Sequence, residues 1–147
     1  METIYFSAHI NAPREKVWDI MLGKDTYIEW AKKFGQGSHY EGDWNEGSDI
    51  FFFGADSQTG MASKINESRK PEFVSIKHVG LVMNGVVDTT SDEAKKWAPA
   101  FENYTLKEVD GETELSVSLD ILPEHKSMFE QMWPKALKLL KELVEKE

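Results

Sequence analysis

The sequence predicts an α+β fold in which a strand and two short helices precede six further strands and a long C-terminal helix. Three observations support this prediction. Apolar and polar residues alternate near the N-terminus, as they do in a half-buried strand. Turn-forming residues divide residues 38–122 into short β-type runs, and residues 123–147 carry an apolar stripe at helical spacing. No repeat or linker interrupts the chain, so we expect a single domain over residues 1–147.

The first strand and the first helix are predicted from the first 23 residues. Apolar side chains alternate along the strand at Ile4, Phe6, Ala8 and Ile10. Asn11 is expected to cap the helix, and Pro13 suits its first turn, where the missing N–H would have no partner anyway. The helix is expected to end at Gly23 after an apolar set at helical spacing: Val17, Trp18, Met21 and Leu22.

A second short helix is predicted from Asp25 to Phe34, with Gly35 as its stop. Its apolar face is expected to hold Tyr27, Ile28, Ala31 and Phe34. Six strands should follow, around Ser38–Trp44, Asp49–Phe53, Met61–Glu67, Phe73–Val82, Phe101–Val109 and Glu114–Leu122. Asp110-Gly111 between the last two is a strong hairpin signal.

The remaining interval, Val87 to Pro99, is expected to be irregular, with one helical turn at Asp92–Lys96. The last helix is predicted over Pro123–Glu147. Its apolar stripe is expected to consist of Met128, Met132, Ala136, Leu139, Leu140 and Leu143. Pro134 lies inside this pattern and removes a helical hydrogen bond, which predicts a kink or break near Phe129–Trp133.

This order of elements resembles that of the START-like or SRPBCC superfamily. The segment Ile10 to Trp18 reads INAPREKVW and is similar to the opening hxAPhexVW pattern, while GETEL at Gly111 to Leu115 is similar to the late GxTxL hairpin. The resemblance covers nearly the whole chain and points to the polyketide-cyclase-like and heat-shock-protein ATPase activator homologue branches. It implies a helix-grip fold, a curved antiparallel seven-stranded sheet around the long C-terminal helix. These branches share no single activity, so the resemblance implies a class of ligand rather than a reaction.

A strongly bent sheet cannot bring all of its inner side chains into contact with one helix, so this fold predicts a gap filled by aromatic side chains or by a ligand. Period-two alternation indicates which side chains point inward. The predicted inward set is Ile50, Phe52, Met61, Ser63, Ile65, Val74, Ile76, His78, Glu102, Tyr104, Leu106, Leu115, Val117 and Leu119.

The predicted cavity takes residues from this face, from the C-terminal helix and from aromatic residues at its mouth. The candidate ligand-binding residues are Trp30, Phe34, Trp44, Phe52, Met61, Ile76, His78, Trp97, Tyr104, Met128, Phe129, Met132 and Trp133. Plain core packing is the alternative role for each aromatic residue. The expected ligand is an apolar or aromatic small molecule, such as a lipid or a polyketide-like compound.

Two polar residues fall on the apolar face, His78 and Glu102. Neighbouring strands would place them together inside, where a carboxylate orients an imidazole and favours its charged form. The pair is a candidate acid/base couple, as used by cyclases and hydrolases. The alternative is that Glu102 faces solvent or pairs with a basic residue at the rim.

Composition excludes several other classes of function. The formal charge of −9 disfavours nucleic acid and anionic membranes as partners, and the absence of cysteine removes disulfides and thiolate chemistry. The histidines do not follow metal-ligand spacing, and no nucleotide or nucleophile-elbow motif is present, so no cofactor or metal is expected. No signal peptide or membrane span is recognisable, which predicts a cytoplasmic protein.

Phe51 and Phe53 lie on the outer side of a strand whose inner side is also apolar. They must be covered from outside or form a self-association surface, so a homodimer is expected. Three functions stay open. The first is carriage or sequestration of the ligand, the second is an enzyme that cyclises or hydrolyses it, and the third is a co-chaperone-like partner of an ATPase.

Overall fold

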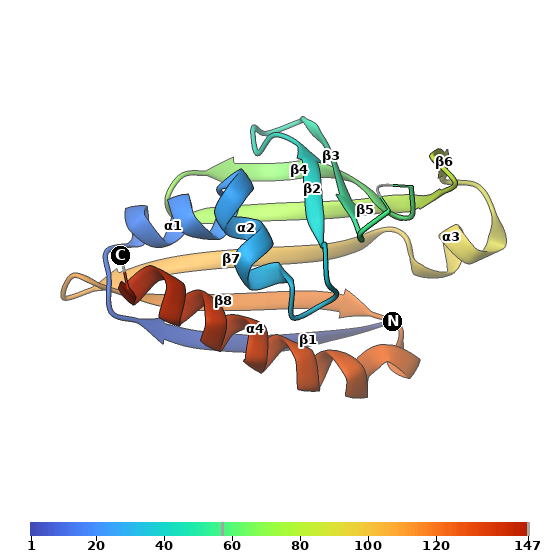
Figure 1. Ribbon diagram of the computed structural model, residues 1–147. Helices are drawn as coiled ribbons and strands as arrows, with labels where there is room; N and C mark the ends of the chain where they lie inside the picture. The colour runs from blue at the N-terminus through green and yellow to red at the C-terminus, as the bar shows by residue number, and fades with distance from the viewer. Residues whose placement is uncertain (57, 147) are drawn as a thin grey trace.

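The computed structural model describes residues 1–56 and 58–146 and consists of a curved antiparallel sheet with its helices gathered mainly on one face (Figure 1). The strands are β1 (Glu2–Ile10), β2 (His39–Gly42), β3 (Asp49–Phe53), β4 (Gly60–Arg69), β5 (Phe73–Met83), β6 (Val86–Asp88), β7 (Ala100–Val109) and β8 (Glu112–Ile121). The helices are α1 (Arg14–Leu22), α2 (Lys24–Ala31), α3 (Asp92–Trp97), the short 3₁₀ turn η1 (Pro123–His125) and α4 (Lys126–Lys146).

The strands follow the order β1-β8-β7-β5-β4-β3-β2, with β6 paired to β5. The predicted fold class, the helix-grip arrangement and the short helix at Asp92 are confirmed. The sheet has eight strands rather than seven, because part of the interval expected to be irregular forms β6. The Asn84-Gly85 turn produces this extra hairpin, since both residues have positive φ, 53° and 78°, as a tight hairpin turn requires.

Helix α4 crosses the concave side of the sheet and contacts β1, α1 and α2 (Figure 1). The side chains that it buries are Trp133, Ala136, Leu137, Leu140 and Val144. The predicted stripe was therefore misplaced at several positions. Met128 is 46% exposed, and Met132, Leu139 and Leu143 are only partly buried. The sheet is broad enough to accept a different face of the helix.

Helix α4 runs without a break through Pro134, contrary to the expected interruption. Pro134 and Glu130, the residue four positions earlier, are both exposed. Water can therefore bind the carbonyl that the missing N–H leaves free. The expected end of the helix at Glu147 lies outside the described residues.

Two predicted details of the N-terminal helices were wrong. Asn11 does not cap α1, whose N-cap is Pro13 without a side-chain bond, and the Asn11 backbone N–H donates to the Glu145 carboxylate at 2.8 Å. Helix α2 buries Trp30 rather than Ile28, which is 39% exposed. The Trp30 indole N–H donates to the Met21 carbonyl at 3.0 Å, so a partner in α1 satisfies this buried polar group.

The predicted inward face of the sheet is confirmed along every strand to which it was applied. All of its members are buried except Met61 and Glu102, which are partly buried. Inward-facing Ile, Val and Leu side chains of the strands form one core cluster with the buried residues of α1 and α4. No helix in the described part of the chain is long and apolar enough to cross a membrane.

Candidate functional site

A cavity of about 740 Å³ lies between the sheet, α2, α3 and the N-terminal half of α4. Its volume falls within the range of small-molecule sites. Aromatic side chains from α2 and the segment after it, from α3 and α4, and from two strands, β3 and β7, dominate its wall: Tyr27, Trp30, Phe34, Phe52, Phe53, Trp97, Phe101, Tyr104, Phe129 and Trp133. Three methionines, three leucines and one isoleucine add to them: Met61, Met128, Met132, Leu81, Leu119, Leu122 and Ile121.

Most of the predicted cavity residues do line this space. They are Trp30, Phe34, Phe52, Met61, His78, Trp97, Tyr104, Met128, Phe129, Met132 and Trp133. Trp44 and Ile76 do not. Ile76 is only 1% exposed within the core, and Trp44 packs edge-on against Tyr40 at 5.3 Å between ring centroids. The parity rule places Ile76 on the correct face but cannot tell core from cavity.

One end of the cavity is charged and lies where α3 faces η1. Glu93 and Lys96 come from α3, and Glu124 and His125 come from η1. Lys96 Nζ lies 3.8 Å from Glu124 Oε1 across this end. Both side chains are well exposed, so the ion pair adds little to stability.

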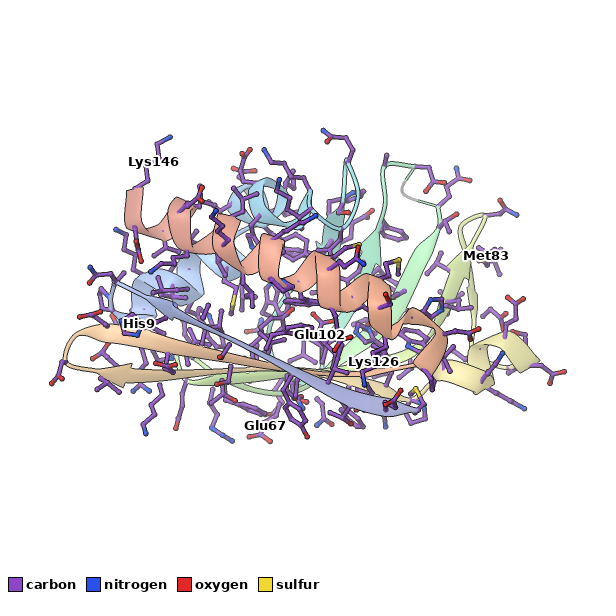
Figure 2. The ribbon with its side chains drawn as sticks, turned by 90° about the horizontal axis from the view of Figure 1, so that it is seen from below. His9, Glu67, Met83, Glu102, Lys126 and Lys146 are labelled. Atoms are coloured by element: carbon purple, nitrogen blue, oxygen red, sulfur yellow. The ribbon has the colours of Figure 1, made fainter. Side chains whose placement is uncertain are left out.

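A chain of four hydrogen-bonded polar side chains is set into the apolar wall. Ser63 Oγ lies 2.7 Å from His78 Nδ1, and His78 Nε2 lies 3.0 Å from Glu102 Oε1. The Tyr104 hydroxyl donates to Glu102 Oε2 in a short hydrogen bond. Seen from below, Glu102 lies beneath α4, between the helix and the sheet (Figure 2).

Strand register brings these four residues together. Ser63 is the cross-strand partner of His78 on the β4–β5 ladder. Glu102 pairs with Ile76, so it is a diagonal neighbour of His78, and Tyr104 follows it on the same face of β7. The structure thus brings together the predicted pair, while Ser63 and Tyr104 were predicted to point inward but not to join it.

The two members of the predicted pair differ in access to the cavity. The His78 side chain is 4% exposed, its ring stacks on Trp97 at 5.3 Å, and the edge-on Phe52 ring lies 5.8 Å away. Both ring nitrogens already have partners. The Glu102 side chain is 18% exposed, so this carboxylate is the part of the polar chain most open to a ligand.

Two tyrosines beside Glu102 are held in their neutral form. Burial, reinforced by the Glu102 charge, raises the pKa of Tyr104 well above its ordinary value. Burial and the same carboxylate also raise the pKa of Tyr27. Both phenols therefore keep their protons at neutral pH and can act only as hydrogen-bond donors or neutral acceptors.

Trp133 joins the cavity wall to the core. Its ring lies 4.9 Å from Phe34, 5.9 Å from Phe6 and 6.1 Å from Tyr104. It is 4% exposed although it lines the cavity. It also lies 6.3 Å from the Trp30 ring of α2, so one side chain packs α4 against both α2 and the sheet.

No group of three or more His, Cys, Asp or Glu side chains is placed to hold a metal ion within residues 1–56 and 58–146. The expectation that the site needs no metal or cofactor stays a prediction.

Comparisons with known proteins support the same fold. A family model described as Activator of Hsp90 ATPase homolog 1-like protein matches residues 11–145. Protein MLL2253 from Mesorhizobium loti is 14% identical, with a TM-score of 0.74 over 99% of this chain and 98% of that one. The Aha1 dimer from Colwellia psychrerythraea is 17% identical, with a TM-score of 0.73 over 98% and 96%.

CalU16 from Micromonospora echinospora is a third similar structure, 17% identical with a TM-score of 0.65 over 97% of this chain and 73% of that one. A search of curated protein sequences finds no match. At these identities the similarity to solved structures establishes the fold, while the function must be argued from the site.

Proposed function

This chain belongs to the Activator of Hsp90 ATPase homolog 1-like family, and from that premise we propose that it binds an apolar or aromatic small molecule in its internal cavity, for carriage or sequestration. One observation supports this function above all. The cavity of about 740 Å³ is walled mainly by aromatic side chains and methionines, so it offers a large dry surface to a flat or flexible ligand. A lipid or a polyketide-like compound has the required character.

Binding without catalysis is favoured because most of the hydrogen-bonded side chains of the cavity wall are enclosed and cannot reach a ligand. The His78 side chain is 4% exposed, its ring stacks on Trp97, and both of its nitrogens already have partners, so it has no free nitrogen to offer a substrate. Among the four hydrogen-bonded side chains, Glu102 is the one with appreciable access to the cavity. One accessible carboxylate can orient a ligand, whereas acid/base catalysis also needs a route by which its proton is replenished.

The second candidate function is an enzyme of the cyclase or hydrolase type, and the hydrogen-bonded chain is the observation that favours it. Glu102 would exchange a proton with the substrate, while His78 and Ser63 would hold the carboxylate in place from behind. Mass spectrometry of a bound compound over time separates the two functions. Carriage leaves the compound unchanged, whereas catalysis converts it.

The apolar cavity predicts binding of the neutral fluorescent probe N-phenyl-1-naphthylamine, which brightens in dry surroundings. In the double variant Met61→Trp/Met132→Trp, two indoles occupy space in the cavity, so we expect the probe affinity to fall by about tenfold or more, in line with an overpacking cost of about 1–3 kcal/mol. Met83→Trp is the matched control, because Met83 is 50% exposed and outside the cavity. Equal probe affinity in all three proteins would show that the probe binds elsewhere.

Self-association is a separate proposal, and it rests on Phe51 and Phe53. These two rings stack at 6.2 Å along β3 and are only partly buried, and Phe53 also lines the cavity, so Phe51 is the ring that tests the proposal. If they form a dimer interface, Phe51→Ser should shift the sedimentation coefficient towards that of a monomer. A wild-type protein that stays monomeric at high concentration would contradict the proposed dimer. The co-chaperone-like role and the cytoplasmic location stay predictions.

A further inference from the structure

We propose that the cavity selects ligands that carry a positively charged amino group, and that Glu102 is the carboxylate that binds this group. The inference rests on the proposed binding function and adds to it the chemical class of the ligand: an apolar or aromatic body with a protonated amine. It follows from the unused hydrogen-bonding capacity of Glu102, the charge of the cavity wall and the aromatic rings near the carboxylate.

Glu102 has room for a further donor. Its two oxygens each form one hydrogen bond, with His78 Nε2 and with the Tyr104 hydroxyl. An ionised carboxylate has about four acceptor positions, so about two stay open. The side chain lines the cavity and retains 18% of its exposure, so a ligand donor can approach these positions.

The partners of Glu102 hold the carboxylate in one orientation and leave its other acceptor positions open to a ligand. Ser63 Oγ lies 2.7 Å from His78 Nδ1, and His78 Nε2 lies 3.0 Å from Glu102 Oε1, so this chain of contacts ends on one carboxylate oxygen. The Tyr104 phenol donates to the other oxygen and brings no positive charge. A buried negative charge without a cation is costly, and a protonated amine would supply one at hydrogen-bonding distance.

The remaining charges of the wall also favour a cation. The lining contains the carboxylates of Glu93, Glu102, Asp120 and Glu124, against Lys96 as its one Lys or Arg among the described residues. His39 and His125 are its other titratable bases besides His78. The chain as a whole carries a formal charge of −9. Such a field raises the local concentration of cations and disfavours anionic ligands.

Aromatic rings complete the chemistry expected around an amine. Tyr104 bonds to the carboxylate, Trp97 stacks on the His78 ring, and the Glu102 charge acts on Tyr27 strongly enough to help raise its pKa. All three rings line the same cavity. Electron-rich ring faces attract cations within about 6 Å, so they would support the ammonium group that Glu102 holds.

The experiment compares three probes that share a naphthalene body and differ in charge: 2-naphthylmethylamine, 2-naphthalenemethanol and 2-naphthoate. Their affinities are measured at pH 7 by calorimetric titration. Because a hydrogen bond to a charged group contributes about 1.5–3 kcal/mol, the wild-type protein should bind the amine about 10- to 100-fold more tightly than the alcohol. The carboxylate should bind most weakly.

Glu102→Gln is the decisive variant, since glutamine keeps the size of the side chain and can still bond to His78 and Tyr104. It should lose the preference for the amine while its affinity for the alcohol changes less than about threefold. Glu130→Gln removes the same formal charge from an exposed position on α4 outside the cavity lining and should keep the preference.

The outcomes separate this inference from the proposed function. If the alcohol and N-phenyl-1-naphthylamine bind in the cavity but the amine has no advantage, or keeps its advantage in Glu102→Gln, the inference is wrong and the binding function stands. If none of the probes binds, both are wrong. Loss of the amine preference in Glu102→Gln alone supports the inference.

Discussion

Replacing Trp133 with alanine is expected to lower the free energy of unfolding by about 3–5 kcal/mol, the range measured for large aromatic residues in cores. Trp133 is 4% exposed and packs against rings from β1, α2, β7 and the segment after α2. Its removal would merge a new void with the existing cavity and loosen α4 from the sheet. Urea denaturation followed by far-UV circular dichroism measures the change.

The matched control is Trp97→Ala, which removes the same side chain from the cavity wall near its charged end. Trp97 lies on a six-residue helix and is only partly buried, and its ring stacks on that of His78. We expect less than half of the destabilisation seen for Trp133→Ala. Equal losses from the two variants would contradict the view that Trp133 joins the cavity wall to the core.

The second large effect is expected for His78→Leu, in which an apolar side chain fills most of the space of the imidazole but can form neither of its hydrogen bonds. The hydroxyl of Ser63, a residue only 2% exposed, and one oxygen of Glu102 would lose their partner. An unsatisfied buried group costs about 1–3 kcal/mol, so the expected loss is about 2–5 kcal/mol. Thermal and urea unfolding at pH 7 measure it.

A double-mutant cycle tests the cause of that loss. Ser63→Ala/His78→Leu removes the stranded hydroxyl together with the imidazole, so it should be less destabilised than the sum of the two single variants. A coupling of about 0.5–3 kcal/mol would identify the hydrogen bond as the origin. Strict additivity would show that the two side chains act independently, contrary to the chain of contacts described above.

Strand patterns predicted the inward face of the sheet, because alternation has only two solutions and large apolar side chains select one. The meeting of His78 with Glu102 followed from that parity, although the parity says nothing of the hydrogen bonds that enclose His78. Ser63 and Tyr104 carried a signal as well, since both are polar groups on an apolar face. Their link to the pair depends on the ladder register, which a single strand does not reveal.

Other features depend on tertiary packing and were not predictable from local patterns. The face that α4 buries is set by the shape of the sheet, so Leu137 and Val144 are in the core while Met128 is largely exposed. Ile76 and Tyr104 have the same parity, yet only Tyr104 reaches the cavity. The β6 hairpin did have a local signal, the Asn84-Gly85 dipeptide.

The distribution of methionines allows the central claim, that the ligand binds inside the cavity, to be read from one spectrum. Met61, Met128 and Met132 line the cavity, whereas Met1, Met21 and Met83 do not. Met21 is fully buried, and Met1 and Met83 are exposed, so these three control for both global change and surface binding. Their methyl groups give separate signals when the protein carries ¹³C-methyl methionine.

The measurement is a ¹H–¹³C correlation spectrum of the methionine methyls during titration with N-phenyl-1-naphthylamine. The account predicts saturable shifts of Met61, Met128 and Met132, caused by the aromatic rings of the probe, with the other three signals nearly unchanged. Shifts confined to Met1 and Met83, or no shift of any signal at saturating probe, would contradict ligand binding in this cavity.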